Sequence, residues 1–551
     1  MKSITVSLGQ AQGTFAPGVT VKEVLDALAP DVPALCAMRG GVCLQLNERL
    51  DADAALEPLT YEDEEGRRVY ERSLRFLFLL SMKRLYPGKR VRMLNSVGHG
   101  LYIRMAEGAM GHDMAKALQE DMQRLAEADL PFERETWTRE EAIAYFEKEG
   151  WPDKAELLRY RPRDRITMYR INGLCEYFYG AMLPSTGYVR GFYVKPHFPG
   201  VALMFPSPED PQTPAPYVSR AKFLRVYSTS QQWCGILGAE NAADVNKMIQ
   251  QGRMREFIRI NEALHDKSIA GIADEILRRG ARIVMIFGPS SSGKTTFAHR
   301  LSVHLRVLGL KPRLISLDDF YLDRKAVPLE DDGKPDLEHI NALDVPLLSE
   351  CLEGLLSGRT VNLPRYDFTT GSRAPQGQTL TLGPDEPLLL EGIHAMNDLI
   401  TSELPEQLTY GIYVSALGCV NLDDHNRIRT TDVRLLRRIV RDMRFRNTSP
   451  RQTIDMWPKV RQGEERWIFP NQEKADVMFN TSLHYELPVL KTIAYELLLG
   501  IPSTAPEYLV ARRLLKVLHY FLPVDGAVMD EIPPLSILRE FIGECSFYDM
   551  H

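Results

Sequence analysis

The sequence predicts an α/β fold with a doubly wound parallel sheet in the C-terminal half of the chain, and three observations support this prediction. Short apolar runs typical of buried parallel strands occupy 283–287, 314–317, 388–390, 412–414 and 477–479, with helical segments between most of them. A loop rich in glycine and serine follows the first run and leads directly into a helical segment. Acidic residues follow the second and third runs, at the edge where such sheets bind their ligands.

The composition is that of a soluble protein with more than one domain. The chain has 551 residues, of which 44% are hydrophobic and 25% charged, and single cores rarely exceed about 250–300 residues. The net charge of −6 excludes a basic field over the whole surface, so RNA contact would require a local patch. The seven cysteines are dispersed and argue against a disulfide framework. Because we find no signal peptide and no apolar run of about 20 residues, we expect a cytoplasmic protein without a membrane partner.

We expect five segments along the chain. Residues 1–63 alternate as strands around one helical stretch and predict a small α+β domain. Residues 64–205 combine helical stretches with a strand region rich in glycine and aromatic residues. Residues 206–279 begin with a proline-rich stretch and continue as a helical connector. Because proline has no backbone N–H to donate, this stretch is expected to be a loop. The α/β domain spans 280–485, and 486–551 are expected to form a helical C-terminal extension.

The loop after the first apolar run matches the P-loop pattern G-x-x-x-x-G-K-[ST], with a strand before it and a helix after it. Its glycines allow successive backbone amides to face an anion at the positive end of the helix dipole. We expect Lys294 to reach the β- and γ-phosphates of ATP and Thr295 to bind Mg²⁺. The predicted ATP-binding residues of the loop are Gly288, Ser290, Ser291, Ser292, Gly293, Lys294, Thr295 and Thr296. A chance glycine–serine loop is the alternative.

Two carboxylates follow strands of this predicted sheet. Asp318 follows the second run, where it can accept a proton from an attacking hydroxyl or help to hold the metal. Glu391 ends the third run, where a buried charge is costly unless a cation lies nearby, and Mg²⁺ would meet that need. A solvated turn at Asp318 and a structural salt bridge at Glu391 are the alternatives.

Arginines are concentrated between 427 and 446. On a helix, the spacing i, i+3, i+4, i+7 predicts one shared cationic face for Arg434, Arg437, Arg438 and Arg441. Such a face suits a lid that closes over the triphosphate and neutralises the charge that develops during transfer. A solvated basic helix is the alternative.

Residues 280–485 resemble the uridine kinase and phosphoribulokinase family of P-loop kinases. The resemblance rests on GPSSSGKT (288–295), SLDDFY (316–321), YDF (366–368), EGI (391–393) and DVRLLRR (432–438) followed by RD (441–442). It implies an α/β P-loop NTPase fold and the use of ATP and Mg²⁺. The implied catalytic residues are Asp318, Lys294, Arg434 and Arg438, with Arg437 and Arg441 in the ATP site and Thr295, Glu391 and Asp318 around the metal. The implied acceptor-binding residues are Asp318, Tyr321, Glu338, Tyr366 and Arg373, with Glu338 at the ribose hydroxyls.

Two departures from this family place pyrimidine specificity in question. Gly371 stands where uridine kinases place a histidine that contacts the base. A long insert, 416–431, also separates the fourth apolar run from the lid arginines.

The N-terminal segments resemble other families. Residues 1–63 resemble a TGS domain, a β-grasp module. Residues 64–205 resemble the second, editing domain of threonyl-tRNA synthetase, on NSVGHGL (95–101), LCEYFY (174–179) and PSTGY (184–188). Editing domains of that type use H-x-x-x-H and C-x-x-x-H, whereas the four positions here are Asn95, His99, Cys175 and Tyr179. With two imidazoles missing, neither the metal site nor the editing hydrolysis carries over, and His99 and Cys175 can equally be core residues.

The leading hypothesis is an ATP- and Mg²⁺-dependent phosphotransferase that acts on a hydroxyl of a small nucleoside-like substrate. Two alternatives stay open. One is a kinase of a different small alcohol. The other is a nucleotide-gated regulator whose N-terminal half contacts RNA. The sequence leaves the acceptor and the oligomeric state open.

Overall fold

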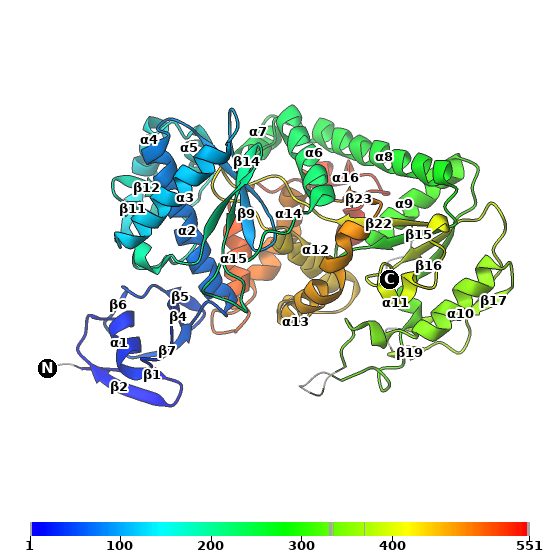
Figure 1. Ribbon diagram of the computed structural model, residues 1–551, viewed down its shortest axis with the longest axis horizontal. Coiled ribbons are helices and arrows are strands. Elements are labelled where there is room, and N and C mark those ends of the chain that lie inside the picture. The colour runs from blue at the N-terminus through cyan, green and yellow to red at the C-terminus, as the bar shows by residue number, and fades with distance from the viewer. Residues whose placement is uncertain (1–2, 330–332, 334, 368–369, 548–551) are drawn as a thin grey trace.

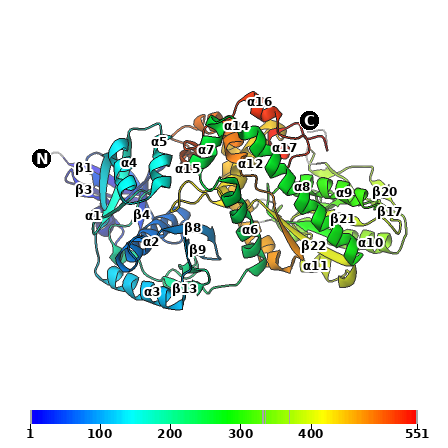
Figure 2. The same cartoon turned by 90° about the horizontal axis from the view of Figure 1, so that it is seen from above.

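Figure 1 shows the computed structural model of the chain, which describes residues 3–329, 333, 335–367 and 370–547. Met1, Lys2 and Phe368, which belong to segments discussed above, lie outside the described residues. The molecule is elongated, with the N-terminal unit at one end and the parallel sheet toward the other (Figures 1 and 2).

The N-terminal unit is a small mixed sheet with one packed helix. Its elements are β1 (Ile4–Leu8), β2 (Ala11–Phe15), β3 (Val19–Thr20), α1 (Val21–Leu28), β4 (Cys36–Arg39), β5 (Val42–Leu44), β6 (Arg49–Leu50) and β7 (Ala54–Leu59). The five-stranded sheet has the order β2-β1-β7-β4-β5, and β1 pairs antiparallel with β2 and parallel with β7. Helix α1 starts at a capping box between Thr20 and Glu23. This is the β-grasp-like fold expected of residues 1–63.

Residues 64–205 build an α+β unit around one long helix. Its elements are α2 (Glu64–Leu85), β8 (Val91–Ser96), β9 (Gly100–Met105), α3 (His112–Glu127), β10 (Glu133–Thr138), α4 (Arg139–Lys148), α5 (Pro152–Arg159), β11 (Arg165–Ile171), β12 (Leu174–Glu176), β13 (Tyr193–His197) and β14 (Gly200–Met204). They include a four-stranded sheet, β13-β14-β9-β8, and a three-stranded sheet, β10-β11-β12. Helix α2 is buried along much of its length, and its Leu77 packs in one core with Met93 of the larger sheet and Leu118 of α3.

A helical connector leads from this unit to the parallel sheet. The proline-rich stretch 206–216 contains no helix or strand, and α6 (Ala221–Leu237), α7 (Ala242–Gln250) and α8 (Met254–Arg279) follow it. The Asn241 side chain accepts from the Asp244 amide and caps α7.

The third zone is a five-stranded sheet in the order β16-β21-β15-β22-β23, and its strands pair in parallel. Its strands are β15 (Ile283–Phe287), β16 (Arg313–Ser316), β21 (Leu388–Glu391), β22 (Thr409–Ser415) and β23 (Val477–Asn480). Its helices are α9 (Lys294–Val307), α10 (Val345–Leu356), α11 (Asp398–Thr401), α12 (Thr430–Phe445) and α13 (Pro450–Gly463). Two short strand pairs lie outside the sheet: β17 (Val361–Leu363) with β20 (Gln378–Leu380), and β18 (Tyr366–Asp367) with β19 (Ser372–Arg373).

Successive residues of the central strand β15 face opposite sides of the sheet. Val284 and Ile286 share a core with Phe297 of α9, whereas Met285 shares another core with Leu348 of α10. Helices therefore cover both faces, and the predicted doubly wound fold is confirmed.

The C-terminal helices return to this sheet. They are α14 (Glu486–Leu499), α15 (Tyr508–Leu518), α16 (Gly526–Asp530) and α17 (Arg539–Ile542). Leu490 and Phe541 lie in the same core as Tyr227 of the connector and Val284 of the sheet. Within the described ranges, no helix is both long and apolar enough to cross a membrane.

Candidate active site

The P-loop connects the central strand β15 to helix α9, and Figure 1 labels both elements. Gly288 has a φ of +155°, and a Cβ at this position would lie 1.9 Å from the Val414 carbonyl oxygen, so only glycine fits. Gly293 has a φ of +86° and precedes the first turn of α9. The backbone therefore curls and ends at a helix N-terminus, as phosphate binding requires.

Two hydroxyls of the loop are buried without a hydrogen-bond partner. Ser291 and Ser292 are 4% and 0% exposed, and neither side-chain oxygen finds a partner among the described residues. Buried polar groups in native proteins are nearly always paired, so such unpaired groups are consistent with a site for a polar ligand. Lys294 Nζ donates to the Pro289 carbonyl oxygen at 3.3 Å.

Two carboxylates lie at the carboxyl edge of the sheet beside this loop. Asp318 lies in the 3₁₀ turn after β16, and Glu391 ends β21, where it pairs in register with both Ser316 and Ile286. Burial raises the pKa of Glu391 to about 7, assisted by the charges of Asp318 and Glu540 and opposed by Lys294 and by a hydrogen bond with Thr295.

Asp318 is reached by solvent but is crowded by protein. This crowding raises the pKa of Asp318, and the positive charges of Lys294, Arg446 and Arg441 oppose the shift. Ser316, two residues before Asp318, lies opposite Glu391 in the sheet, and Lys294 is the first residue of α9, so all three residues lie at the same edge of the sheet. The charge of Lys294 opposes the raised pKa of both carboxylates.

Helix α12 lies against the P-loop through two of the predicted lid arginines. Arg434 Nη1 donates to the Ser290 carbonyl oxygen at 2.9 Å, and Arg438 Nη1 donates to Ser290 Oγ at 2.8 Å. Arg441 pairs with Asp442 at 2.7 Å. The arginines are ion-paired and mostly buried, so α12 is not a solvated basic helix.

Arg437 departs from the expected shared face. Its side chain is fully buried, pairs with Glu486 at 2.6 Å and lies 5.0 Å from the centre of the Phe541 ring. Arg437 and Arg438 are successive residues, and successive side chains point about 100° apart on a helix. Arg437 instead packs against α14 and α17 and donates to Thr481 Oγ1 at 3.2 Å and to the Thr481 carbonyl oxygen at 2.9 Å. Because the Thr481 hydroxyl in turn donates to the Ser292 carbonyl of the loop, Arg437 supports the loop through Thr481 and does not contact Ser290 as Arg434 and Arg438 do.

Glu464 is a site residue that the sequence analysis missed. Its carboxylate accepts from the Ser290 amide at 3.1 Å and pairs with Arg434 and Arg461, the Arg434 Nη2 to Glu464 Oε2 distance being 2.7 Å. The residue lies in a π-helical turn after α13, and no local motif marks it. Its position in the site follows from its ion pairs with Arg461 and Arg434, which lie 3 and 30 residues before it in the sequence.

Two of the predicted acceptor residues, Tyr321 and Tyr366, lie together next to the turn that carries Asp318. The rings of Tyr321 and Tyr366 lie 5.6 Å apart, and the Tyr321 hydroxyl donates to the Leu337 carbonyl at 3.0 Å. Burial raises the pKa of Glu338 to about 7, while Arg438 and Lys294 oppose the shift. Glu338 therefore lies within the field of the P-loop and of α12.

A cavity of about 570 Å³ opens beside this group, lined by Arg365, Tyr366, Asp367, Ala374, Pro375 and Gln376. The Tyr366 amide donates to Asp319 Oδ1 at 3.3 Å, which links the cavity wall to the turn that carries Asp318. Arg373 pairs with Asp344 at 2.8 Å. Gly371 has a φ of +68°, and a Cβ there would lie 2.6 Å from Arg324 Cδ, so the Arg324 side chain occupies the space beside it.

The model of the family described as phosphoribulokinase / uridine kinase matches residues 283–486. Uridine kinases of Lactobacillus helveticus and Deinococcus deserti are 31% and 30% identical to the chain over 201 and 197 residues. These matches cover 36% of this chain and 84% and 86% of those enzymes. The chain belongs to the phosphoribulokinase / uridine kinase family. Among solved structures, a possible uridine kinase from Bacillus stearothermophilus is 22% identical, with a TM-score of 0.27 over 38% of this chain and 97% of that one.

The family accounts for one part of the chain, and threonine–tRNA ligases match the N-terminal region. Those of Carboxydothermus hydrogenoformans and Halorhodospira halophila are each 30% identical, over 182 and 196 residues, or 32% and 35% of this chain. The chain spans 29% and 30% of the length of these ligases.

Two of the positions equivalent to the editing site, His99 and Cys175, differ in their exposure to solvent. His99 lies exposed in the turn between β8 and β9, whereas Cys175 is fully buried in β12, and its backbone amide donates to the Tyr145 hydroxyl at 2.9 Å. Burial raises the pKa of the Cys175 thiol. In the part of the chain that the structure describes, no group of three or more His, Cys, Asp or Glu residues could hold a metal ion.

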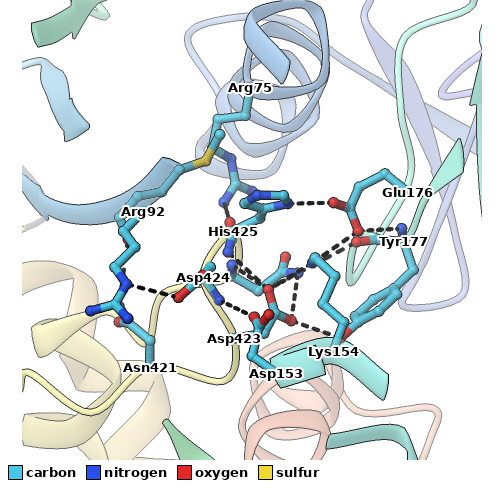
Figure 3. Close-up of polar contacts among 12 residues, drawn as sticks. Arg75, Arg92, Asp153, Lys154, Glu176, Tyr177, Asn421, Asp423, Asp424 and His425 are labelled. Atoms are coloured by element: carbon cyan, nitrogen blue, oxygen red, sulfur yellow. Dashed lines mark hydrogen bonds and ion pairs between the residues drawn. The ribbon is translucent and has the colours of Figure 1, made fainter. Parts of the chain in front are cut away.

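The insert 416–431 connects this family domain to the N-terminal half. The buried Lys154 of α5 pairs with Asp423 at 2.7 Å and with Glu176 at 3.0 Å, and Glu176 contacts His425 at 2.6 Å (Figure 3). Arg429, the last residue before α12, pairs with Glu71 of α2 at 2.6 Å. The insert therefore anchors the start of the α12 helix to the N-terminal half.

Proposed function

We propose that this protein transfers the γ-phosphoryl group of ATP to a hydroxyl of a small nucleoside-like acceptor, with Mg²⁺. The observation that carries the proposal is the convergence of Asp318, Glu391 and Lys294 at the carboxyl edge of the sheet, beside a correctly built P-loop. Unpaired buried hydroxyls in the loop and a buried carboxylate next to Thr295 provide polar groups suited to a metal–nucleotide complex.

Each residue has a role in this proposal. The ATP phosphates would bind the loop amides of Gly288, Ser290, Ser291, Ser292, Gly293, Lys294, Thr295 and Thr296, with Arg441 nearby. Thr295, Glu391 and Asp318 would hold Mg²⁺, which supplies charge neutralisation between the phosphates when bound. Asp318 would accept the proton of the acceptor hydroxyl. Arg434 and Arg438 would stabilise the charge of the transferring group, and Tyr321, Glu338, Tyr366 and Arg373 would orient the acceptor.

The test is an ATP-dependent phosphorylation assay with a panel of nucleosides. We expect product with at least one nucleoside, and Lys294→Ala should lower the rate about 10²–10³-fold because a charged donor to the transferring group is lost. Lys116→Ala, on the exposed side of α3, is the matched control and should leave the rate unchanged. Absence of turnover and of ATP binding in the wild type would refute the proposal.

The panel should also contain small alcohols that are not nucleosides, because Gly371 replaces the histidine of uridine kinases and Arg324 fills the space beside it. Sugar phosphates and glycerate are suitable members. Turnover with these alone would assign a different small-alcohol kinase.

Glu391 makes metal use dependent on pH. Because burial raises its pKa to about 7, it is mostly protonated at pH 6 and mostly ionised at pH 8, and only the ionised form binds a metal. We expect the half-saturating Mg²⁺ concentration to be about tenfold higher at pH 6 than at pH 8. In Glu391→Gln this tenfold change in the half-saturating Mg²⁺ concentration should disappear. Only the change that arises from protonation of the nucleotide itself should remain. Identical pH profiles for the variant and the wild type would contradict this role.

The similarity to threonine–tRNA ligases favours a second function, RNA contact through the N-terminal half. The charge of the first 63 residues, nine acidic and four basic, opposes it. Filter binding of bulk tRNA at two salt concentrations tests it, because binding to phosphates must weaken as salt rises.

A further inference from the structure

The short C-terminal helix α17 brings a carboxylate to the P-loop helix. Glu540 Oε2 accepts from the Thr296 amide at 3.3 Å and from Thr296 Oγ1 at 2.9 Å. Thr296 is the third residue of α9, where backbone amides have no partner within the helix. A negative side chain of the same chain thus occupies part of the positive end of the helix that the phosphate-binding loop leads into.

The surroundings of Glu540 differ from those of Glu464, the other carboxylate on the loop. Glu464 is neutralised by Arg434 and Arg461. Glu540 is only 8% exposed, and among the described residues it forms no ion pair within 4.0 Å. The charge of Glu540 is therefore met by the amide and hydroxyl of Thr296, which are groups that a P-loop offers to phosphate oxygens.

The segment that carries Glu540 is firmly held next to the loop. Ile537 Cγ2 lies 2.4 Å from where a Cβ of Gly293 would be, so its methyl group packs directly on the loop backbone. Ile537, Leu538 and Phe541 are all fully buried, and Phe541 also stacks under Arg437 of α12. This packing keeps the backbone of 537–541 in place, so the flexible side chain of Glu540 is the part that can move away.

We propose that Glu540 is an internal competitor for the nucleotide phosphates. A phosphate oxygen that bound the Thr296 amide would have to displace the Glu540 carboxylate, because the two anions need the same donors and repel each other. ATP binding would then include the withdrawal of this side chain, and Glu540 would lower the affinity of the site for ATP. This inference rests on the proposed ATP binding.

The experiment is a calorimetric titration of the full-length protein with Mg²⁺–ATP. Glu540→Gln keeps the shape and an acceptor oxygen but removes the charge, and we expect it to bind ATP about tenfold more tightly or better, as for loss of a competing charge-assisted hydrogen bond. Glu540→Asp withdraws the carboxylate by one methylene and should give an intermediate gain. Glu544→Gln, whose side chain is 80% exposed in the same segment, is the matched control and should match the wild type.

The outcomes separate this inference from the proposed function. Equal or weaker ATP binding by Glu540→Gln and Glu540→Asp, beside measurable binding by the wild type, overturns the competition and leaves the kinase proposal standing. Absence of ATP binding in the wild type and in every variant overturns both. Tighter binding by both Glu540 variants, with Glu544→Gln unchanged, supports the competition.

Discussion

Replacement of Asp318 by asparagine is expected to lower kcat about 10²–10⁴-fold, the usual contribution of a positioned general base. Asp318 lies one turn beyond β16, on the edge that carries Glu391 and faces Lys294. Asparagine keeps the size of the side chain but cannot accept the acceptor proton at neutral pH. Steady-state kinetics with saturating ATP would measure the loss, and the affinity for ATP should change far less than kcat.

Asp319→Asn is the matched control for this prediction. Asp319 is the next residue in the same turn, and its Oδ1 accepts from the Tyr366 amide at 3.3 Å, a contact that an asparagine oxygen preserves. We expect a loss below about tenfold. In the wild type, kcat should fall on the acid side at a pH above 3.8, because the protein crowded around Asp318 raises the pKa of its carboxylate from that value. A larger loss of kcat in Asp319→Asn than in Asp318→Asn would show that Asp319, and not Asp318, is the general base.

Replacement of Lys154 by methionine is expected to destabilise the protein by about 3–5 kcal/mol, as found when one partner of a buried ion pair is removed. Lys154, Asp423 and Glu176 are each 0% exposed in their side chains, and Lys154 Nζ contacts both carboxylates (Figure 3). Methionine has a similar length but leaves two buried carboxylates without their cation. Urea unfolding followed by circular dichroism would measure the loss.

The pH dependence gives this prediction a second readout. Burial opposes ionisation of Asp423, but Lys154 and His425 outweigh it, and the pKa falls from 3.8 to about 2. A carboxylate with a lowered folded pKa contributes stability that is present above pH 3.8 and is lost as the pH falls through about 2. The difference in the free energy of unfolding between the wild type and Lys154→Met should therefore become smaller as the pH falls from 3.8 to about 2. Lys148→Met, exposed at the end of α4, should stay within about 0.5 kcal/mol of the wild type. An equally small change in the free energy of unfolding of Lys154→Met would contradict the prediction, because it would show that Asp423 and Glu176 do not need Lys154 to stay buried.

The insert 416–431 shows how the two halves of the molecule are joined. It is a departure from the uridine kinase pattern in sequence, and in the structure its Asp423 and His425 are buried against the N-terminal half. Because α12 begins within the last two residues of the insert, the arginines that contact Ser290 are carried by a helix whose start is anchored to that half. The sequence marked the insert as unusual but contained no local pattern for its partners.

The sequence by itself determined the parallel sheet, the P-loop and the two strand-end carboxylates, because each depends on signals within about ten neighbouring residues: apolar runs, glycine spacing and the strand-to-turn boundary. Tertiary structure alone decided which way Arg437 points, that Glu464 and Glu540 contact the loop, and that Lys154 neutralises Asp423. Those contacts join residues 30 to 269 positions apart. Their partners are selected by packing and by the high cost of an unpaired buried charge, which no short segment of sequence expresses.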